Sequence, residues 1–448
     1  MALIGIRSTL WGRIVRLSPP ALLVTLYLTV ILAGAILLWL PISQQAGISF
    51  FDALFTATSA VTVTGLAVVD TGGDFTFIGQ VILALLIQFG GLGLMTFAVF
   101  VLSAIGVKVG LGGRLILRED LNQSSMGDLL KLVKLLLSVA LICEAGGAAI
   151  LAFVFVPEMG WLDGLWFAIF HAISAFNNAG FSLESQSLSP WVGNPVINLV
   201  ISALFILGGL GFVVLADLYE TRQWRGLSLH TKIMLYGTAV LMIVPWVLFA
   251  ALEWTNPATL GPLSIWDKLQ ASWFQALTPR TAGFNTLDTA GMHEATTLMT
   301  MALMVIGGGS TSTAGGIKVT TAVVLVLATI AFFRKRTELH AFGRSLALDE
   351  VMKVLALTVV SILILAFALF VVSITFDGLF LTLAFEVVSA FGTVGLSMGA
   401  TGELDALGRA TIMVVMFLGR VGPLTLGFFL ATHSVARVRY PKGRIYLG

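Results

Sequence analysis

Residues 58–66 of this chain read Thr-Ser-Ala-Val-Thr-Val-Thr-Gly-Leu, and three later segments resemble them. These segments are Ile-Ser-Ala-Phe-Asn-Asn-Ala-Gly-Phe at 173–181, Ala-Leu-Thr-Pro-Arg-Thr-Ala-Gly-Phe at 276–284 and Val-Ser-Ala-Phe-Gly-Thr-Val-Gly-Leu at 388–396. Ten positions before each glycine stands an aromatic residue, and six positions before it stand Ser59, Ser174, Leu277 and Ser389. A second glycine register follows at Gly90, Gly208, Gly307 and Gly419. The chain therefore contains a fourfold internal repeat.

The composition identifies the class of protein. Of 448 residues, 58% are apolar and 11% are charged, against about 25% charged residues in soluble domains. So few charges cannot cover that much apolar surface in water, which excludes a soluble enzyme and a nucleic-acid-binding protein. A disulfide scaffold is excluded because Cys143 is the single cysteine. The chain is predicted to be an integral membrane protein.

Positive charge is concentrated in five patches, which hold twenty of the 25 Lys and Arg residues. The patches are Arg7/Arg13/Arg16, Lys108/Arg114/Arg118 with Lys131/Lys134, Arg222/Arg225/Lys232, Arg334/Lys335/Arg336 with Arg344 and Lys353, and Arg437/Arg439/Lys442/Arg444. Because cytoplasmic loops carry an excess of Lys and Arg, the patches and both termini are predicted to be cytoplasmic. Each of the four intervals between patches must then leave the cytoplasm and return.

Each interval contains three apolar segments, of which the middle one is short. The spans are predicted at residues 21–41, 78–106, 129–156, 194–220, 230–254, 295–333, 351–375 and 409–433. Short helices are predicted to begin near Phe51, Trp166, Lys268 and Leu381. A helix of about twelve residues is about 18 Å long, roughly half a bilayer, so it must enter from outside and return there.

The predicted fold is thus an all-α polytopic membrane protein with four membrane–pore–membrane units around one central pore. The units are residues 1–120 with the basic N-terminal arm, 121–225, 226–345 with a broken second span, and 346–448 with the basic C-terminus.

The glycine loops predict a cation pore. Irregular backbone is tolerated at membrane depth only where it is buried or lines a water-filled path. Four short helices would point their negative C-terminal ends at the membrane centre, and rings of carbonyls are how potassium filters replace hydration water. The predicted ion-binding residues, with potassium as the bound metal ion, are Val63, Thr64, Gly65, Asn178, Ala179, Gly180, Thr281, Ala282, Gly283, Thr393, Val394 and Gly395. The alternative is that these glycines only pack helices, which is the better interpretation for Gly90, Gly208 and Gly419.

Residues 295–333 are too long for one span, at about 58 Å if helical. Their middle is a polar, glycine-rich loop, which the flanking lengths place within the membrane: Gly307, Gly308, Gly309, Ser310, Thr311, Ser312, Thr313, Ala314, Gly315 and Gly316. A phosphate-binding loop is disfavoured because Lys318 lacks the flanking Gly and Ser/Thr of that motif. A passive kink is the remaining alternative.

Three charged residues need an explanation. Arg420 stands mid-span where sister repeats have Gly91, Gly209 and Gly308, so it is a candidate for an electrostatic barrier, a contact of the polar loop, or a pair with Glu144 or Glu386. Lys318 either contributes to the same loop or extends to the interface. Arg280 lies inside the third repeat segment, and we expect its side chain to point away from the axis.

These residues resemble the Trk/Ktr/HKT superfamily of potassium transporters, over nearly the whole chain. Within it, the chain is most similar to the bacterial KtrB membrane subunits, because no extra pair of spans precedes Ala21. The resemblance implies that four glycines select potassium, and that the loop 307–316 with Lys318 and Arg420 is a gate below the filter. It also implies sodium-stimulated uptake, possible transport of Na+ beside K+, a homodimer, and a KtrA-like cytoplasmic nucleotide-binding ring as partner. The expected location is the bacterial inner membrane, in contact with lipid.

Two rival functions remain open. A secondary cation symporter working by alternating access would use the broken helix as its binding site, but it predicts inverted repeats. A membrane scaffold leaves the four glycine loops unexplained. No enzymatic activity, organic cofactor or nucleic-acid partner is expected.

Overall fold

The computed structural model describes residues 19–93, 129–335 and 339–422, and these residues are mostly helical. The first repeat holds α2 (Pro19–Trp39), α3 (Phe50–Val61) and α4 (Phe77–Gly91). The second holds α7 (Leu129–Met159), α8 (Trp161–Phe176), η1 (Ser189–Trp191), α9 (Pro195–Leu210) and α10 (Phe212–Thr221). The third holds α11 (Leu229–Glu253), α12 (Ile265–Leu277), α13 (Glu294–Val305) and α14 (Val319–Phe333). The fourth holds α15 (Leu348–Val372), α16 (Phe380–Gly392), α17 (Ala400–Glu403) and α18 (Ala406–Val421).

The short helices α3, α8, α12 and α16 form as the repeat predicts. Two of them begin at a serine cap, where Ser49 Oγ accepts from the N–H of Asp52 at 3.1 Å and Ser264 Oγ accepts from that of Asp267 at 3.2 Å. Such caps satisfy backbone donors that a helix start leaves free. Helix α8 begins at Trp161, directly after Gly160 and five residues before the predicted Trp166.

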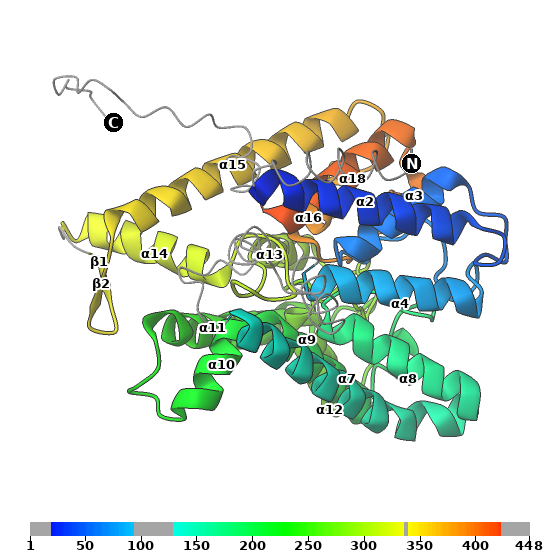
Figure 1. Cartoon of the computed structure of the whole chain (residues 1–448), viewed down its shortest axis with the longest axis horizontal. Helices are drawn as coiled ribbons and strands as arrows, with labels where there is room; N and C mark the ends of the chain where they lie inside the picture. Colours follow the sequence, from blue (N-terminus) through cyan, green and yellow to red (C-terminus); the bar gives the residue numbers. More distant parts are fainter. Residues whose placement is uncertain (1–18, 94–128, 336–338, 423–448) are drawn as a thin grey trace, which may run out of the picture.

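The helices pack in a closed cycle. In each repeat the first long helix packs on its own short helix, as in α2 on α3 and α7 on α8. The helix after each glycine loop packs on the short helix of the next repeat, namely α4 on α8, α9 on α12, α13 on α16 and α18 on α3. Figure 1 shows the result, since the sequence colours follow one another around the molecule from α2 to α18. The four short helices are thereby held around a common centre.

Several predicted spans are confirmed and two are interrupted. Within the described residues α7, α11 and α15 contain apolar stretches long enough to cross a membrane. The span predicted at 194–220 is wrong as a continuous helix, because α9 and α10 meet at 91° at Gly211, whose φ of +96° ends the helix. The long predicted span at 295–333 breaks into α13 and α14, as expected.

Some predicted features lie outside the described residues. These are the basic arm before residue 19, the end of the second span with the patch at 108–118, and the end of the eighth span with the C-terminal patch. The count of eight spans therefore stays a prediction. The structure adds an antiparallel hairpin of β1 (Leu339–Ala341) and β2 (Arg344–Leu346) between α14 and α15, which the sequence analysis missed.

Candidate functional site

The four repeat glycines meet at the centre of the molecule. A side chain on Gly65 would collide with the carbonyl of Ala179, and one on Gly180 would lie 2.9 Å from the Cα of Gly283. In the same way Gly283 faces the carbonyl of Val394, and Gly395 faces Gly65. Each glycine thus touches the next repeat, and the fourth touches the first. Segments far apart in the sequence form a closed ring of backbone, which we call the glycine ring (residues 63–65, 178–180, 281–283 and 393–395).

In each segment of the ring, the first and third residues have positive φ and the middle residue does not. All four glycines have positive φ, from +68° to +93°. The residues two positions earlier, Val63, Asn178, Thr281 and Thr393, also have positive φ, from +49° to +74°. This conformation is costly for residues with a Cβ and is typical of functional sites. Because no side chain fits at the crowded glycines, the sequence requires glycine there for both space and φ.

The N–H groups of the ring turn back to the short helices. Ser59 Oγ accepts from the N–H of Gly65 at 3.0 Å, and Ser389 Oγ accepts from that of Gly395 at 3.1 Å. In the second repeat Ser174 instead donates to the carbonyl of Phe181 at 2.8 Å. In the third repeat the sequence alignment places Leu277 at the position of these serines. The structure corrects this, because the equivalent hydroxyl belongs to Thr278, which donates to the carbonyl of Phe284 at 2.6 Å.

The carbonyls of the ring are left free. Within the described parts of the chain, no hydrogen bond is donated to the backbone carbonyl of any of the twelve ring residues. Nine of these twelve residues are buried, and Gly65, Gly180 and Gly395 are partly exposed. Buried carbonyls ordinarily have a donor, so a ring of unpaired ones is suited to bind a cation.

The short helices add to this electrostatic preference. Their last residues, Val61, Phe176, Leu277 and Gly392, come only a few positions before the ring glycines. The C-terminal end of a helix carries about half a negative charge, so four such ends favour a cation in the ring.

The second glycine register packs the ring from behind. A Cβ at Gly90 would collide with the carbonyl of Val61, one at Gly208 with that of Phe176, and one at Gly419 with that of Phe391. These carbonyls all stand four residues before a ring glycine. The interpretation of this register as a packing feature is confirmed for these three repeats. In the third repeat Gly307 instead lies in the polar loop, against the carbonyl of Gly315.

The loop between α13 and α14 lies directly beside the ring. A Cβ at Gly307 would be 3.3 Å from the methyl of Thr281, and one at Gly315 would collide with the Thr393 hydroxyl. The loop closes on itself through a parallel bridge between Ile306 and Ile317.

The same loop docks on the bend between α9 and α10. The N–H of Gly309 donates to the carbonyl of Gly209 at 2.7 Å, and that of Thr313 donates to Gly208 at 3.2 Å. In return the N–H of Phe212 donates to the carbonyl of Thr311 at 2.9 Å. The break at Gly211 therefore exposes backbone groups that the loop satisfies, which explains why the two interruptions lie together.

Arg420 joins this loop to the first repeat. Its guanidinium donates to the carbonyls of Thr313 and Gly90 and, at 3.0 Å, to that of Gly91. The predicted loop contact is thus present, and the alternative of an ion pair with a membrane carboxylate is wrong. Within the described part of the chain Glu144 is bonded to Gln88 and Asn177, and Glu386 to Ser397, Met398 and Thr401.

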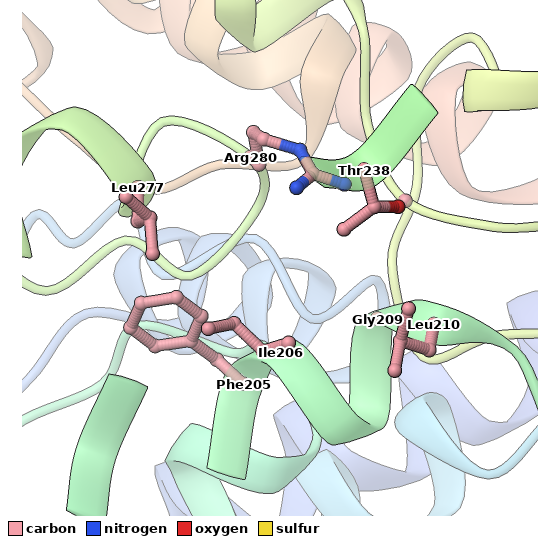
Figure 2. A pocket seen from close by; sticks show the side chains of 8 residues that line it. Phe205, Ile206, Gly209, Leu210, Thr238, Leu277 and Arg280 are labelled. Carbon is pink, nitrogen blue, oxygen red and sulfur yellow. The ribbon is translucent and has the colours of Figure 1, made fainter. Parts of the chain in front are cut away.

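The other two cationic side chains also lie close to the loop. Lys318 donates from Nζ to the carbonyl of Ala314 at 2.6 Å, so it closes the loop and does not extend to an interface. The side chain of Arg280 leaves the ring, as expected, and enters a cavity behind it with Thr238 and Gly308 in its lining (Figure 2).

Sequence reasoning missed one residue of the site and the side-chain role of another. Gly211 escaped notice because it was taken as part of a span, although it follows the pair Gly208–Gly209. Asn178 was predicted for its backbone alone, yet its amide also donates to the Thr281 hydroxyl at 2.9 Å and so links two neighbouring repeats.

The chain has clear similarity to known proteins. A family model for cation transport proteins, TrkH, matches residues 21–434. Ktr system potassium uptake protein B of Bacillus subtilis (strain 168) is 49% identical, over 97% of this chain and 98% of that protein. Potassium/sodium uptake protein NtpJ of Enterococcus hirae is 40% identical, over 97% of this chain and 98% of that protein. The crystal structure of the potassium transporter TrkH from Vibrio parahaemolyticus has a TM-score of 0.70 over 93% of this chain and 86% of that chain, at 21% identity, which shows the same fold.

Proposed function

Because the chain belongs to the TrkH family of cation transport proteins, we propose that it is the membrane subunit of a potassium uptake system. The prediction of a polytopic membrane protein that moves cations is confirmed by this membership. The expectation of a transporter and not an enzyme also agrees with the names of its relatives.

The observation that carries the proposal is the glycine ring with its unpaired carbonyls. Its twelve residues form the selectivity filter, in which a dehydrated potassium ion exchanges water for carbonyl oxygens. No carboxylate belongs to the ring, so selectivity comes from backbone oxygens and not from charged side chains.

The polar loop from Gly307 to Gly316 acts as the gate under this filter. It contacts ring residues Thr281 and Thr393 directly, and Arg420 and Lys318 hold it there. Much of its binding consists of backbone hydrogen bonds to α9 and α10, so it can leave without unpacking a large apolar core.

Control of the gate is assigned to a cytoplasmic partner. The relative from B. subtilis is named as one protein of a Ktr system, which supports a further component for this chain. We propose that this component is a nucleotide-binding ring and that the membrane subunit is a homodimer, as the family resemblance implies. The name of NtpJ includes both ions, which supports a role for sodium beside potassium. Both termini lie in the cytoplasm in this scheme.

The rival function is symport by alternating access. It is supported by the two interrupted helices, α9/α10 and α13/α14, because such transporters bind substrate at broken helices. Such transporters use inverted repeats, whereas these four repeats pack in one direction around a cycle. The cyclic arrangement favours a pore.

The test is potassium uptake in a bacterial strain that lacks its own uptake systems, with and without sodium. Replacing Gly283 with Ser adds a side chain against the carbonyl of Val394 at a φ of +79°. We expect the preference for potassium over sodium to fall about tenfold or more, as for a loss of about 1.4 kcal/mol. Gly146 on α7 has open space around it, so Gly146→Ser is the matched control. Unchanged selectivity in Gly283→Ser at normal expression would refute the carbonyl filter.

A further inference from the structure

A buried guanidinium without a partner lies behind the third strand of the glycine ring. The side chain of Arg280 is only 9% exposed. Among the described residues it makes no ion pair and no side-chain hydrogen bond, and its Nε is buried without an acceptor. An uncompensated buried charge is strongly unfavourable, so the described residues leave this site incomplete and in need of a further group.

A second unpaired donor faces the same space. Thr238 on α11 is 5% exposed, and its hydroxyl has no partner within the described residues. Figure 2 shows the Arg280 guanidinium extending towards α11 beside Thr238, with Phe205 and Ile206 across the cavity that both residues line. A threonine in a helix ordinarily donates to a carbonyl of the preceding turn, as Thr329 does to Leu325 at 2.8 Å.

The size and lining of the cavity restrict what can fill it. There is room for about one particle of the size of water, which favours a small occupant over a phosphate group or a carboxylic acid. The walls supply two donors, one positive charge and otherwise apolar side chains such as Leu277. A single water would satisfy hydrogen bonds but would leave the charge uncompensated, whereas a small anion satisfies both.

We propose that Arg280 and Thr238 bind one monoatomic anion, of the chloride or bromide class, behind the third strand of the filter. The anion compensates the guanidinium, which is covalently adjacent to ring residue Thr281. It thereby removes the repulsion that a bare positive charge would exert on a cation in the ring. Because Gly308 also lines the cavity, the occupant also touches the polar loop.

The binding test uses the full-length protein in detergent. Bromide replaces gluconate at fixed ionic strength and fixed potassium concentration, and thermal unfolding reports saturable binding. We expect bromide to raise Tm in the wild type. Arg280→Gln should abolish the effect, and Thr238→Val should weaken the affinity about two- to tenfold.

Two matched controls separate this site from general effects. Arg409 is paired with Asp52 at 2.8 Å, and the Thr329 hydroxyl is bonded within its own helix, so Arg409→Gln and Thr329→Val should keep the bromide dependence. Crystals soaked in bromide should show anomalous density between Arg280 and Thr238. An empty cavity in the wild type, or a bromide effect that persists in Thr238→Val and Arg280→Gln alike, would overturn the proposal. If Arg280→Gln does not fold, the anomalous density in wild-type crystals and the bromide dependence of Tm in Thr238→Val test the proposal.

A second experiment measures transport and therefore rests on the proposed function. Potassium flux into liposomes should fall severalfold when gluconate replaces chloride. If flux is absent with both anions, the proposed function fails while the binding test still decides the anion site. If flux is present and bromide does not bind, only the anion site is lost.

Discussion

Arg420 shows how one charged side chain can hold three segments together. It bonds the polar loop at Thr313 and the end of α4 at Gly90 and Gly91. Hydrogen bonds from a charged donor contribute about 1.5–3 kcal/mol each, more than neutral ones. In the other repeats the corresponding position is glycine, so the interaction exists at one place in the cycle.

Replacing Arg420 with Gln should therefore favour the open gate. Loss of one charge-assisted hydrogen bond shifts the closed–open equilibrium by about 1.5–3 kcal/mol, so potassium flux should rise about tenfold or more and depend less on the partner. Flux into vesicles at matched expression measures the change.

Arg420→Lys separates charge from geometry, because lysine keeps the positive charge but cannot bond both segments in the same way. Reduced flux in Arg420→Gln would show that the side chain supports the open path.

At the scale of elements, two interrupted helices hold the loop that we propose as the gate. The loop between α13 and α14 fills the space that the 91° bend at Gly211 opens between α9 and α10. Its ends stay close through the Ile306–Ile317 bridge, so the segment between them can be shortened without separating the helices.

Removing Thr311 to Ala314 should open the path. The deletion eliminates the bonds to Phe212, Gly208 and Arg420 that hold the loop under the ring. Potassium flux should rise severalfold and lose control by the partner, while the preference for potassium over sodium stays unchanged because the ring is intact. Uptake with and without the partner measures both effects.

Thr311→Ala is the control for this deletion. The Thr311 hydroxyl bonds only the neighbouring carbonyl of Ser310 among the described residues, whereas its backbone carbonyl holds Phe212 and remains. Flux in this variant should match the wild type. A folded deletion variant with unchanged or reduced flux would leave the loop as a passive kink.

At the scale of the whole molecule, the cycle of short helices gives the four repeats one common orientation, and the positions of the positive charges predict which side faces outward. The loops before α3 and after each later ring strand should all lie outside. Single cysteines at the exposed positions Ala46, Ser185, Ala290 and Glu403, in a Cys143→Ala background, should react with an impermeant reagent added outside intact cells.

The hairpin between α14 and α15 provides the opposite control for this experiment. Cysteine at Gly343, an exposed turn residue, should react only after the membrane is opened. Exclusive internal labelling of any of the four outer positions would contradict four repeats of one orientation.

The sequence determined the class of protein, the fourfold repeat and the identity of the ring glycines. Composition decides membrane insertion because so few charges cannot solvate so many apolar residues. The repeat is visible because each unit needs the same backbone at the centre, and only glycine adopts that backbone without a clash. The length of the third repeat's second span likewise predicted its break.

Only the tertiary structure decided how these parts meet. The 91° bend at Gly211 is stabilised by hydrogen bonds to a loop one hundred residues later, which no local pattern reveals. The partners of Arg420 are backbone carbonyls, which every residue possesses and no sequence motif marks. The unpaired guanidinium of Arg280 is evident only once its surroundings are known, because burial and the lack of a partner depend on packing between distant helices.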